Sequence, residues 1–290
     1  MQGVGLQQGK ETATYLSSNK MIKGILGIIG CPVLDDEIIY SLYQDLDEKK
    51  VYVIDTSPSD TLKAKLESKG IPFTLIDEWS FQNGYADIDK ENCFNIVIYM
   101  NKLGLHSRPQ ILRKTLEDQL KDCQGRVDVI ALYYGSCGNA GWDVSRWASD
   151  TLDIPVFVFR DECGDVCDDC IGVAVGGHKR YCDFVKRYPG MFYVTPSIAG
   201  NWEEYSTELD FTKGFEIMNI YTIKEVFEVY GYKNAVKIDT GIGIQKEEYD
   251  KACERFSEET GLKLLDADPD AVDLYPTERL YLDAKTALGP

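Results

Sequence analysis

The chain has 290 residues, 44% of them hydrophobic, and its 48 acidic against 31 basic residues leave a net charge of −17. An acidic surface of this size repels phosphate backbones and anionic lipid, which argues against nucleic acid and membrane surfaces as partners. No apolar stretch approaches the roughly 18–20 residues that span a bilayer. We therefore expect a cytoplasmic protein with one large domain or two smaller ones.

The chain divides into three parts by composition. Residues 1–20 are rich in Gln, Gly, Ser and Thr and have neither a basic start nor an apolar run, so they predict a disordered leader rather than a signal peptide. Residues 21–265 predict an α/β metal-binding domain, either undivided or made of two or three small subdomains. Residues 266–290 predict a C-terminal extension that begins with a solvated acidic turn, because the aspartates lack the regular spacing of a calcium loop.

Apolar runs alternate with amphipathic stretches almost throughout the chain, which is typical of βαβ units. The pattern predicts an α/β fold with mainly parallel sheets of Rossmann-like units flanked by helices. Strands are expected over 24–30, 51–55, 73–76, 95–100, 127–134, 155–159, 191–195 and 235–239. Helices are expected over 36–48, 59–69, 109–123, 143–151, 178–187, 221–230 and 246–260.

The nine cysteines give the strongest indication of function. Their number is odd, the chain is long and no secretory leader is visible, so a disulfide framework is a poor interpretation. Cys31, Cys137 and Cys163 each lie just beyond the end of a predicted strand. The carboxyl ends of parallel strands form the edge where α/β proteins bind ligands. Three thiols at that edge predict a zinc ion or an iron–sulfur cluster, since both prefer thiolate ligands.

Cys163 belongs to a C-x3-C-x2-C motif that also contains Cys167 and Cys170. Radical S-adenosylmethionine enzymes hold a cluster with this spacing, but too few residues follow Cys170 to complete most of a barrel. All three cysteines are candidate metal ligands, and the motif leaves open whether Cys167 and Cys170 join the main site or form a second one.

Cys137 lies in a glycine-rich turn directly after a strand, together with Gly135, Gly138 and Asn139. Backbone N–H groups in such a turn can bind an anion or the sulfurs of a cluster. No Lys-Ser or Lys-Thr follows, so the turn is not a phosphate-binding P-loop. The alternative is that Cys137 simply packs as a small apolar residue.

Two further residues are candidates for proton transfer. His106 lies in the loop after the strand at 95–100, at the edge of the sheet where it could be a fourth ligand or a proton shuttle. Glu162 precedes Cys163 and could act as a general acid or base. His178 begins a basic helix, for which a surface or capping role is expected.

Several of these residues together resemble a known family. Cys31, the Leu105-His106-x-x-Pro109 segment, Tyr134-Gly135-x-Cys137-Gly138-Asn139, Arg160-x-x-Cys163 and Pro189-Gly190-x-x-Tyr193-x-Thr195 are similar to the DUF1638 family, a domain of unknown function, over roughly residues 22–265. The resemblance implies an anaerobic archaeal or bacterial setting, a shared site built on Cys31, Cys137 and Cys163, and a link to corrinoid-dependent methyl transfer. The family pattern has His-Asp-Cys where this chain has Asp161-Glu162-Cys163.

Three functions compete at this point. The first is a Cys-ligated iron–sulfur centre with an open position that acts on a small molecule in anaerobic one-carbon metabolism. The second is a zinc–thiolate protein, either structural or for methyl transfer to a thiol. The third is a non-catalytic redox or metal accessory partner of a corrinoid methyltransferase system. Across these functions, the expected partners are a small-molecule ligand, a corrinoid or methyltransferase protein, or further copies of the chain. The alternative to all three is an α/β domain whose cysteines are reduced and free of metal.

Overall fold

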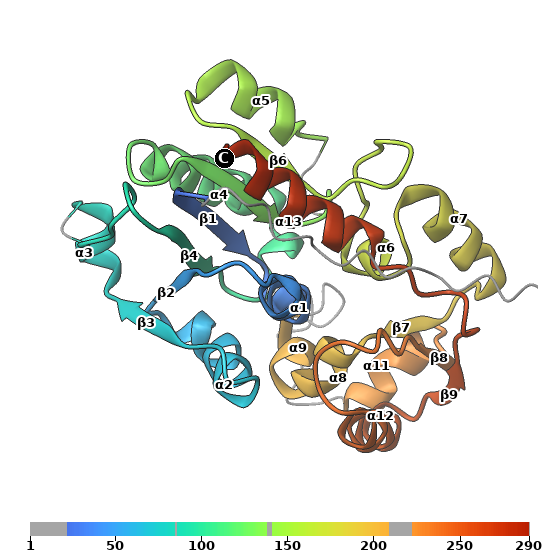
Figure 1. The fold of residues 1–290 in the computed structure, drawn as a ribbon. Coiled ribbons are helices and arrows are strands. Elements are labelled where there is room, and N and C mark those ends of the chain that lie inside the picture. Colours follow the sequence, from blue (N-terminus) through green and yellow to red (C-terminus); the bar gives the residue numbers. More distant parts are fainter. Residues whose placement is uncertain (1–21, 85, 138–140, 209–221, 290) are drawn as a thin grey trace, which may run out of the picture.

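The computed structural model describes residues 22–84, 86–137, 141–208 and 222–289. Its larger sheet has six strands: β1 (Gly24–Gly30), β2 (Lys50–Ile54), β3 (Phe73–Ile76), β4 (Phe94–Met100), β5 (Val129–Tyr133) and β6 (Val156–Val158). They are hydrogen-bonded in the order β3-β2-β4-β1-β5-β6, and every pair is parallel. This arrangement confirms the predicted α/β fold with a parallel sheet (Figure 1).

Helices cover both faces of this sheet. Leu26 and Ile28 of β1 face α1 (Asp35–Gln44), α2 (Asp60–Ser68) and α13 (Tyr275–Ala287) in one buried core. Ile25 and Ile29 face the opposite way, into a second core with α3 (Glu78–Gln82), α4 (Pro109–Cys123) and α5 (Val144–Thr151). Successive side chains of a strand point to opposite faces, so the wholly apolar β1 segment requires cover on both sides.

A second, smaller sheet has the strands β7 (Phe192–Val194), β8 (Asn234–Lys237) and β9 (Lys263–Asp266), in this order and parallel. Its own core contains Phe227, Val236, Tyr249 and Phe256. The helices of this part are α7 (His178–Arg187), α8 (Pro196–Gly200), α9 (Trp202–Glu208), α11 (Ile223–Val229) and α12 (Lys246–Thr260), and Figure 1 shows them grouped around the small sheet.

The short helix α6 (Cys170–Ala174) joins the two parts. Its Ile171 is buried in the core of the small sheet, whereas its Val173 is buried against the large sheet. Cys31 and Cys170 are also packed against both of these cores. The junction of the two parts therefore contains two of the predicted metal ligands.

The expected elements agree with the structure within a few residues, and 109–123, 178–187 and 246–260 agree at both ends. The largest difference is α13, which the acidic start of the 266–290 segment concealed. This helix returns to the large sheet and packs beside β5 and β6. The structure also adds β9, α3, α6, α8 and α9, all of them short elements without a clear periodicity of their own.

A buried polar cluster anchors α13. The ammonium group of Lys285 lies 2.5 Å from Asp45 and 2.7 Å from Asp47, and the hydroxyl of Tyr281 donates to Asp45 at 2.6 Å. Both Asp45 and Lys285 are 4% exposed.

Among the described residues, no helix is long and apolar enough to cross a membrane. All nine cysteines are free thiols.

Candidate functional site

A cavity of about 330 Å³ lies between the carboxyl edge of the large sheet and the small-sheet part. Cys31, Cys137, Cys170 and His106 line it, and we call it the thiol cavity. Three of these residues follow strands of the large sheet, namely β1, β4 and β5, while Cys170 begins α6. The strand order places β1 between β4 and β5, so their ends meet at this point.

The backbone fixes Cys31 beside the end of β5. Its N–H donates to the carbonyl of Tyr133 at 3.1 Å, and its own carbonyl accepts from Leu34 at 2.9 Å. The second bond closes a short 3-10 helix, Pro32–Leu34, for which Cys31 is the N-terminal cap. The chain thus turns sharply after β1 and leaves the thiol at the edge of the sheet.

Cys137 is positioned by close backbone packing of the turn after β5. A Cβ atom on Gly135 would lie 2.7 Å from the Cα of Asp169, a distance that side chains do not tolerate. Ser136 adds two hydrogen bonds to the same segment, from its N–H to the Cys167 carbonyl at 2.9 Å and from its hydroxyl to the Asp168 carbonyl at 3.1 Å. Gly135 therefore lets the turn after β5 approach the backbone of Asp169 closely, which brings the Cys137 turn next to Cys170.

The predicted ligands do not all reach this cavity. Cys163 and Glu162 are exposed on a turn that the carboxylate of Asp161 organises by accepting from the N–H groups of Cys163 and Asp165. Cys167 is fully buried in the core between the large sheet and α13. Gly138 and Asn139 lie outside the described residues. Of the five cysteines proposed as ligands, the structure brings together Cys31, Cys137 and Cys170.

Over the part of the chain that the structure describes, no three His, Cys, Asp or Glu side chains are already grouped as metal ligands. The three thiols share a cavity and interact electrostatically with one another. Occupation by a metal would require them to lose their protons and close in on the ion.

The surroundings keep these thiols uncharged. Burial, together with the nearby carboxyl groups of Asp35 and Glu37, raises the pKa of Cys31 to about 12. Burial also raises the pKa of Cys137 and Cys170, with added contributions from the carboxylate of Asp169. None of the described residues that line the cavity is Lys or Arg. The site therefore lacks a cation of its own among these residues, and a bound metal would supply one.

Two carboxyl groups of the site were not among the predicted site residues. Asp169 lines the cavity, caps α6 by accepting from Gly172 N–H at 2.8 Å, and accepts from the Tyr181 hydroxyl at 2.8 Å. Glu37 is buried in the first turn of α1, and burial followed by the charge of Asp36 raises its pKa to about 8. The sequence signal for both is that of ordinary helix capping, which hides any second role.

His178 makes contacts of its own outside this cavity. Its Nδ1 lies 2.7 Å from Asp168, and its Nε2 lies 3.8 Å from the sulfur of Cys182. It is the first residue of α7, as the sequence indicates, and the Asp168 carboxylate raises its pKa by hydrogen bonding.

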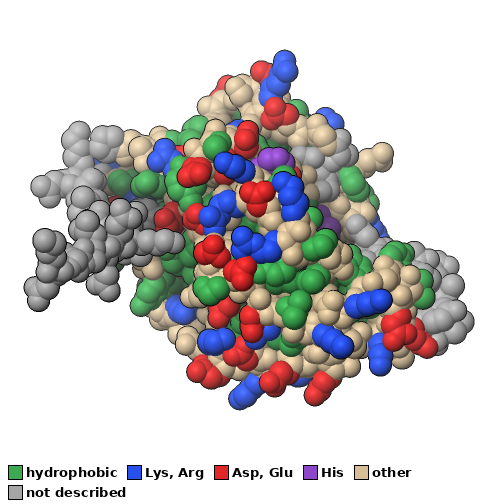
Figure 2. Space-filling view, turned by 90° about the vertical axis from the view of Figure 1, so that its right-hand side faces the viewer, with side chains coloured by type: hydrophobic (Ala, Val, Ile, Leu, Met, Phe, Trp, Pro, Cys, Tyr) green, Lys and Arg blue, Asp and Glu red, His purple; other side chains and the backbone are tan. Residues whose placement is uncertain are grey.

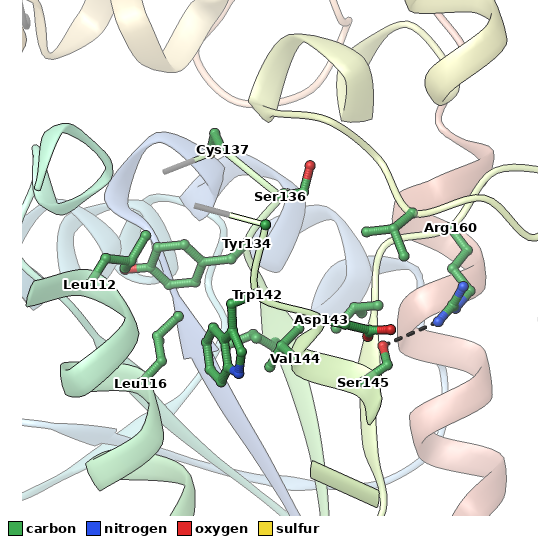
Figure 3. A pocket seen from close by; sticks show the side chains of 15 residues that line it. Leu112, Leu116, Tyr134, Ser136, Cys137, Trp142, Asp143, Val144, Ser145 and Arg160 are labelled. Atoms are coloured by element: carbon green, nitrogen blue, oxygen red, sulfur yellow. Dashed lines mark hydrogen bonds between the residues drawn. The ribbon is translucent and has the colours of Figure 1, made fainter. Parts of the chain in front are cut away.

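A second cavity of about 410 Å³ adjoins the first and shares Tyr134, Gly135 and Cys137 with it. Figure 3 shows Cys137 and Ser136 at one end of it and the indole of Trp142 at the other, with leucines of α4 along one side. The guanidinium of Arg160 donates to the hydroxyl of Ser145 at 3.1 Å on the side of this cavity away from α4.

The fold and the site define an α/β protein with a parallel Rossmann-like sheet, whose carboxyl edge carries a cavity lined by three thiols. A family profile described as "Protein of unknown function (DUF1638)" matches residues 100–275, which is more than half of the chain. The chain belongs to this family. The matched region contains His106, Cys137 and Cys170, whereas Cys31 precedes it. No curated protein and no solved structure matches the chain.

Proposed function

We propose that the protein is a metalloprotein whose centre is held by Cys31, Cys137 and Cys170. One observation carries the proposal: three thiols from three distant chain segments, with His106, line one cavity at the ligand-binding edge of the sheet. Three thiolates are the donor set of an iron–sulfur cluster with one iron left open. The sequence placed Cys163 at the strand ends with Cys31 and Cys137. Cys170 takes its place in the proposed centre because Cys170 lines the cavity and Cys163 does not.

The residues present fit such a group chemically. Deprotonating the three half-buried thiols of the cavity without a cation is costly, because desolvation and neighbouring carboxyl groups oppose it. A metal centre offsets that cost, and an open iron would act as a Lewis acid on a small molecule. His106 lines the same cavity and would transfer a proton to or from the bound molecule. Asp169 also lines the cavity, and it would take the acid–base role that the sequence suggested for Glu162.

A second candidate is a zinc site, and the position of His106 favours it. Three cysteines and one histidine form a common tetrahedral zinc set. With His106 bound, the site would be closed and structural. With His106 released, a zinc-bound thiolate could accept a methyl group, which would suit a corrinoid-linked role.

The setting and partner of the protein are also part of the proposal. Nine free thiols suit a reducing cytoplasm, and ideally one without oxygen. The net charge of −17 suits a basic docking partner such as a corrinoid or methyltransferase protein. On the face drawn in Figure 2 acidic and basic side chains alternate, so that face presents no single-sign patch for such docking.

The test is metal and acid-labile sulfide content of anaerobically purified protein, with its visible spectrum. Iron and sulfide near four per chain with a brown colour would support the cluster, and one colourless zinc would support the second candidate. Cys170→Ser should lose the metal, whereas Cys163→Ser, the matched exposed control from the same motif, should retain it. Absence of metal, or loss in the Cys163 variant alone, would contradict the proposed centre.

A further inference from the structure

Aromatic side chains form much of the lining of the thiol cavity, and we call them the aromatic wall. Six aromatic side chains line the cavity: Tyr134, Tyr181, Phe192, Tyr193, Tyr205 and Tyr232. Apart from Tyr134 of the β5 end, all come from the small-sheet part and its helices. The small sheet thus contributes rings to a site whose thiols come from the other part of the molecule and the junction.

Two of the tyrosine hydroxyls already have acceptors within the protein. The Tyr181 hydroxyl donates to Asp169, and the Tyr193 hydroxyl donates to the carbonyl of Tyr188 at 2.9 Å. Tyr205 lies close enough to the thiols and Asp169 to interact with them electrostatically. These residues therefore offer a ligand chiefly aromatic surface.

The charge of the cavity has one sign among the residues described. Asp169 lines it, and none of the described lining residues is Lys or Arg. An anionic ligand would meet the Asp169 carboxylate without a counter-ion among these residues. A cation would be attracted by the Asp169 carboxylate and by the faces of the aromatic rings.

We infer that the thiol cavity binds a small organic cation of the methylated ammonium or sulfonium class, with its methyl groups against the aromatic wall. This inference rests on the proposed function in that it names the substrate class of the same site. The cavity volume of about 330 Å³ is at the small end of ligand pockets, which suits a ligand of a few carbon atoms. Aromatic rings with a nearby carboxylate are the usual recognition chemistry for such cations.

The test compares choline with its neutral carbon isostere, 3,3-dimethylbutanol, by titration calorimetry on the full-length protein. The two molecules have the same shape, so the ratio of their affinities isolates the charge. We expect choline to bind about tenfold more tightly. Equal affinities, tighter binding of the neutral isostere, or no binding of either molecule would overturn the inference.

Two substitutions at one position separate the ring from its hydroxyl. Tyr205→Leu should reduce the preference for choline at least about threefold, whereas Tyr205→Phe should keep it within about twofold, because the ring carries the attraction. Tyr230→Leu is the control, since Tyr230 is 51% exposed and outside the lining. An unchanged preference in Tyr205→Leu would overturn the assignment of this wall.

Metal content is measured on every sample, before and after treatment with a chelator. A choline preference in protein that never contains metal would leave the cation inference standing and refute the proposed centre. Metal whose binding depends on Cys170, without a preference for choline, would support the proposed centre and refute the cation inference.

Discussion

At the residue scale, Gly135 allows the turn that carries Cys137 to pack against the segment that precedes Cys170. Gly135→Ala would place a methyl group 2.7 Å from the Cα of Asp169, so the turn after β5 must move away from α6. We expect a loss of about 1–3 kcal/mol in the free energy of unfolding, which is typical of overpacking, and weaker metal retention. Urea unfolding and metal content would measure both effects.

Gly172→Ala is the matched control. Its Cβ would find nothing closer than 3.7 Å, and Gly172 lies inside α6. Alanine suits a helix interior better than glycine, so this variant should be neutral or more stable by up to about 1 kcal/mol. If both glycine variants behaved alike, the close approach at Gly135 would not be what positions Cys137.

The raised pKa of Glu37 predicts how the stability of the protein depends on pH. Burial raises its pKa from 4.5 to about 8, so between these values the folded protein holds a proton that the unfolded chain has released. Its contribution to stability is therefore present at low pH and falls as the pH rises through this window.

The substitution Glu37→Gln removes this titration. Between pH 5 and pH 8 the unfolding free energy of the variant should fall less than that of the wild type, and the two decreases should differ by roughly 2–4 kcal/mol. Urea titrations at several pH values measure the difference. Parallel curves for the two proteins would show that Glu37 is ionised in the fold.

At the scale of elements, the attachment of α13 depends on one buried cluster. Lys285→Met keeps most of the side-chain volume but takes away the closest cation of Asp45, which retains the Tyr281 hydroxyl, the Asp47 backbone N–H and the more distant Lys49, 3.7 Å away. Breaking a buried ion pair leaves an uncompensated charge, so we expect a loss of about 2–4 kcal/mol.

The control for this prediction is Lys114→Met, which removes the exposed pair with Asp118 on α4. Exposed pairs of this kind contribute about 0.3–0.5 kcal/mol. Both variants are compared by urea unfolding, with proteolysis of the C-terminal segment as a second measurement. Equal effects would mean that α13 is held by its apolar contacts alone.

At the scale of the whole molecule, the net charge of −17 opposes the compact state through self-repulsion. Raising NaCl from about 0.05 M to about 0.5 M shortens the Debye length from roughly 14 Å to roughly 4 Å. We therefore expect stability at pH 7 to rise by on the order of 1 kcal/mol, measured as the urea midpoint. The effect should disappear near the isoelectric point of about 4.6, and a salt effect of equal size there would contradict this explanation.

The large sheet could be predicted from sequence because its signal is local. Buried parallel strands require continuous apolar runs such as Gly24–Gly30, and amphipathic helices such as 109–123 require periodic apolar residues. The helix α13 could not be predicted in the same way, since an acidic stretch precedes it and its anchor, Asp45, is 240 residues away from Lys285.

The candidate site likewise has features that are local in the sequence and features that depend on tertiary packing. The sequence by itself determined the family resemblance, the α/β class and the placement of Cys31 and Cys137 after β1 and β5, because a strand end is a local property. Only the tertiary structure decided that Cys170 rather than Cys163 lines the cavity with them, and that Asp169 and six aromatic residues line the same cavity. The physical reason is that these residues meet through the packing of α6 between two cores, and no spacing along the chain encodes that contact.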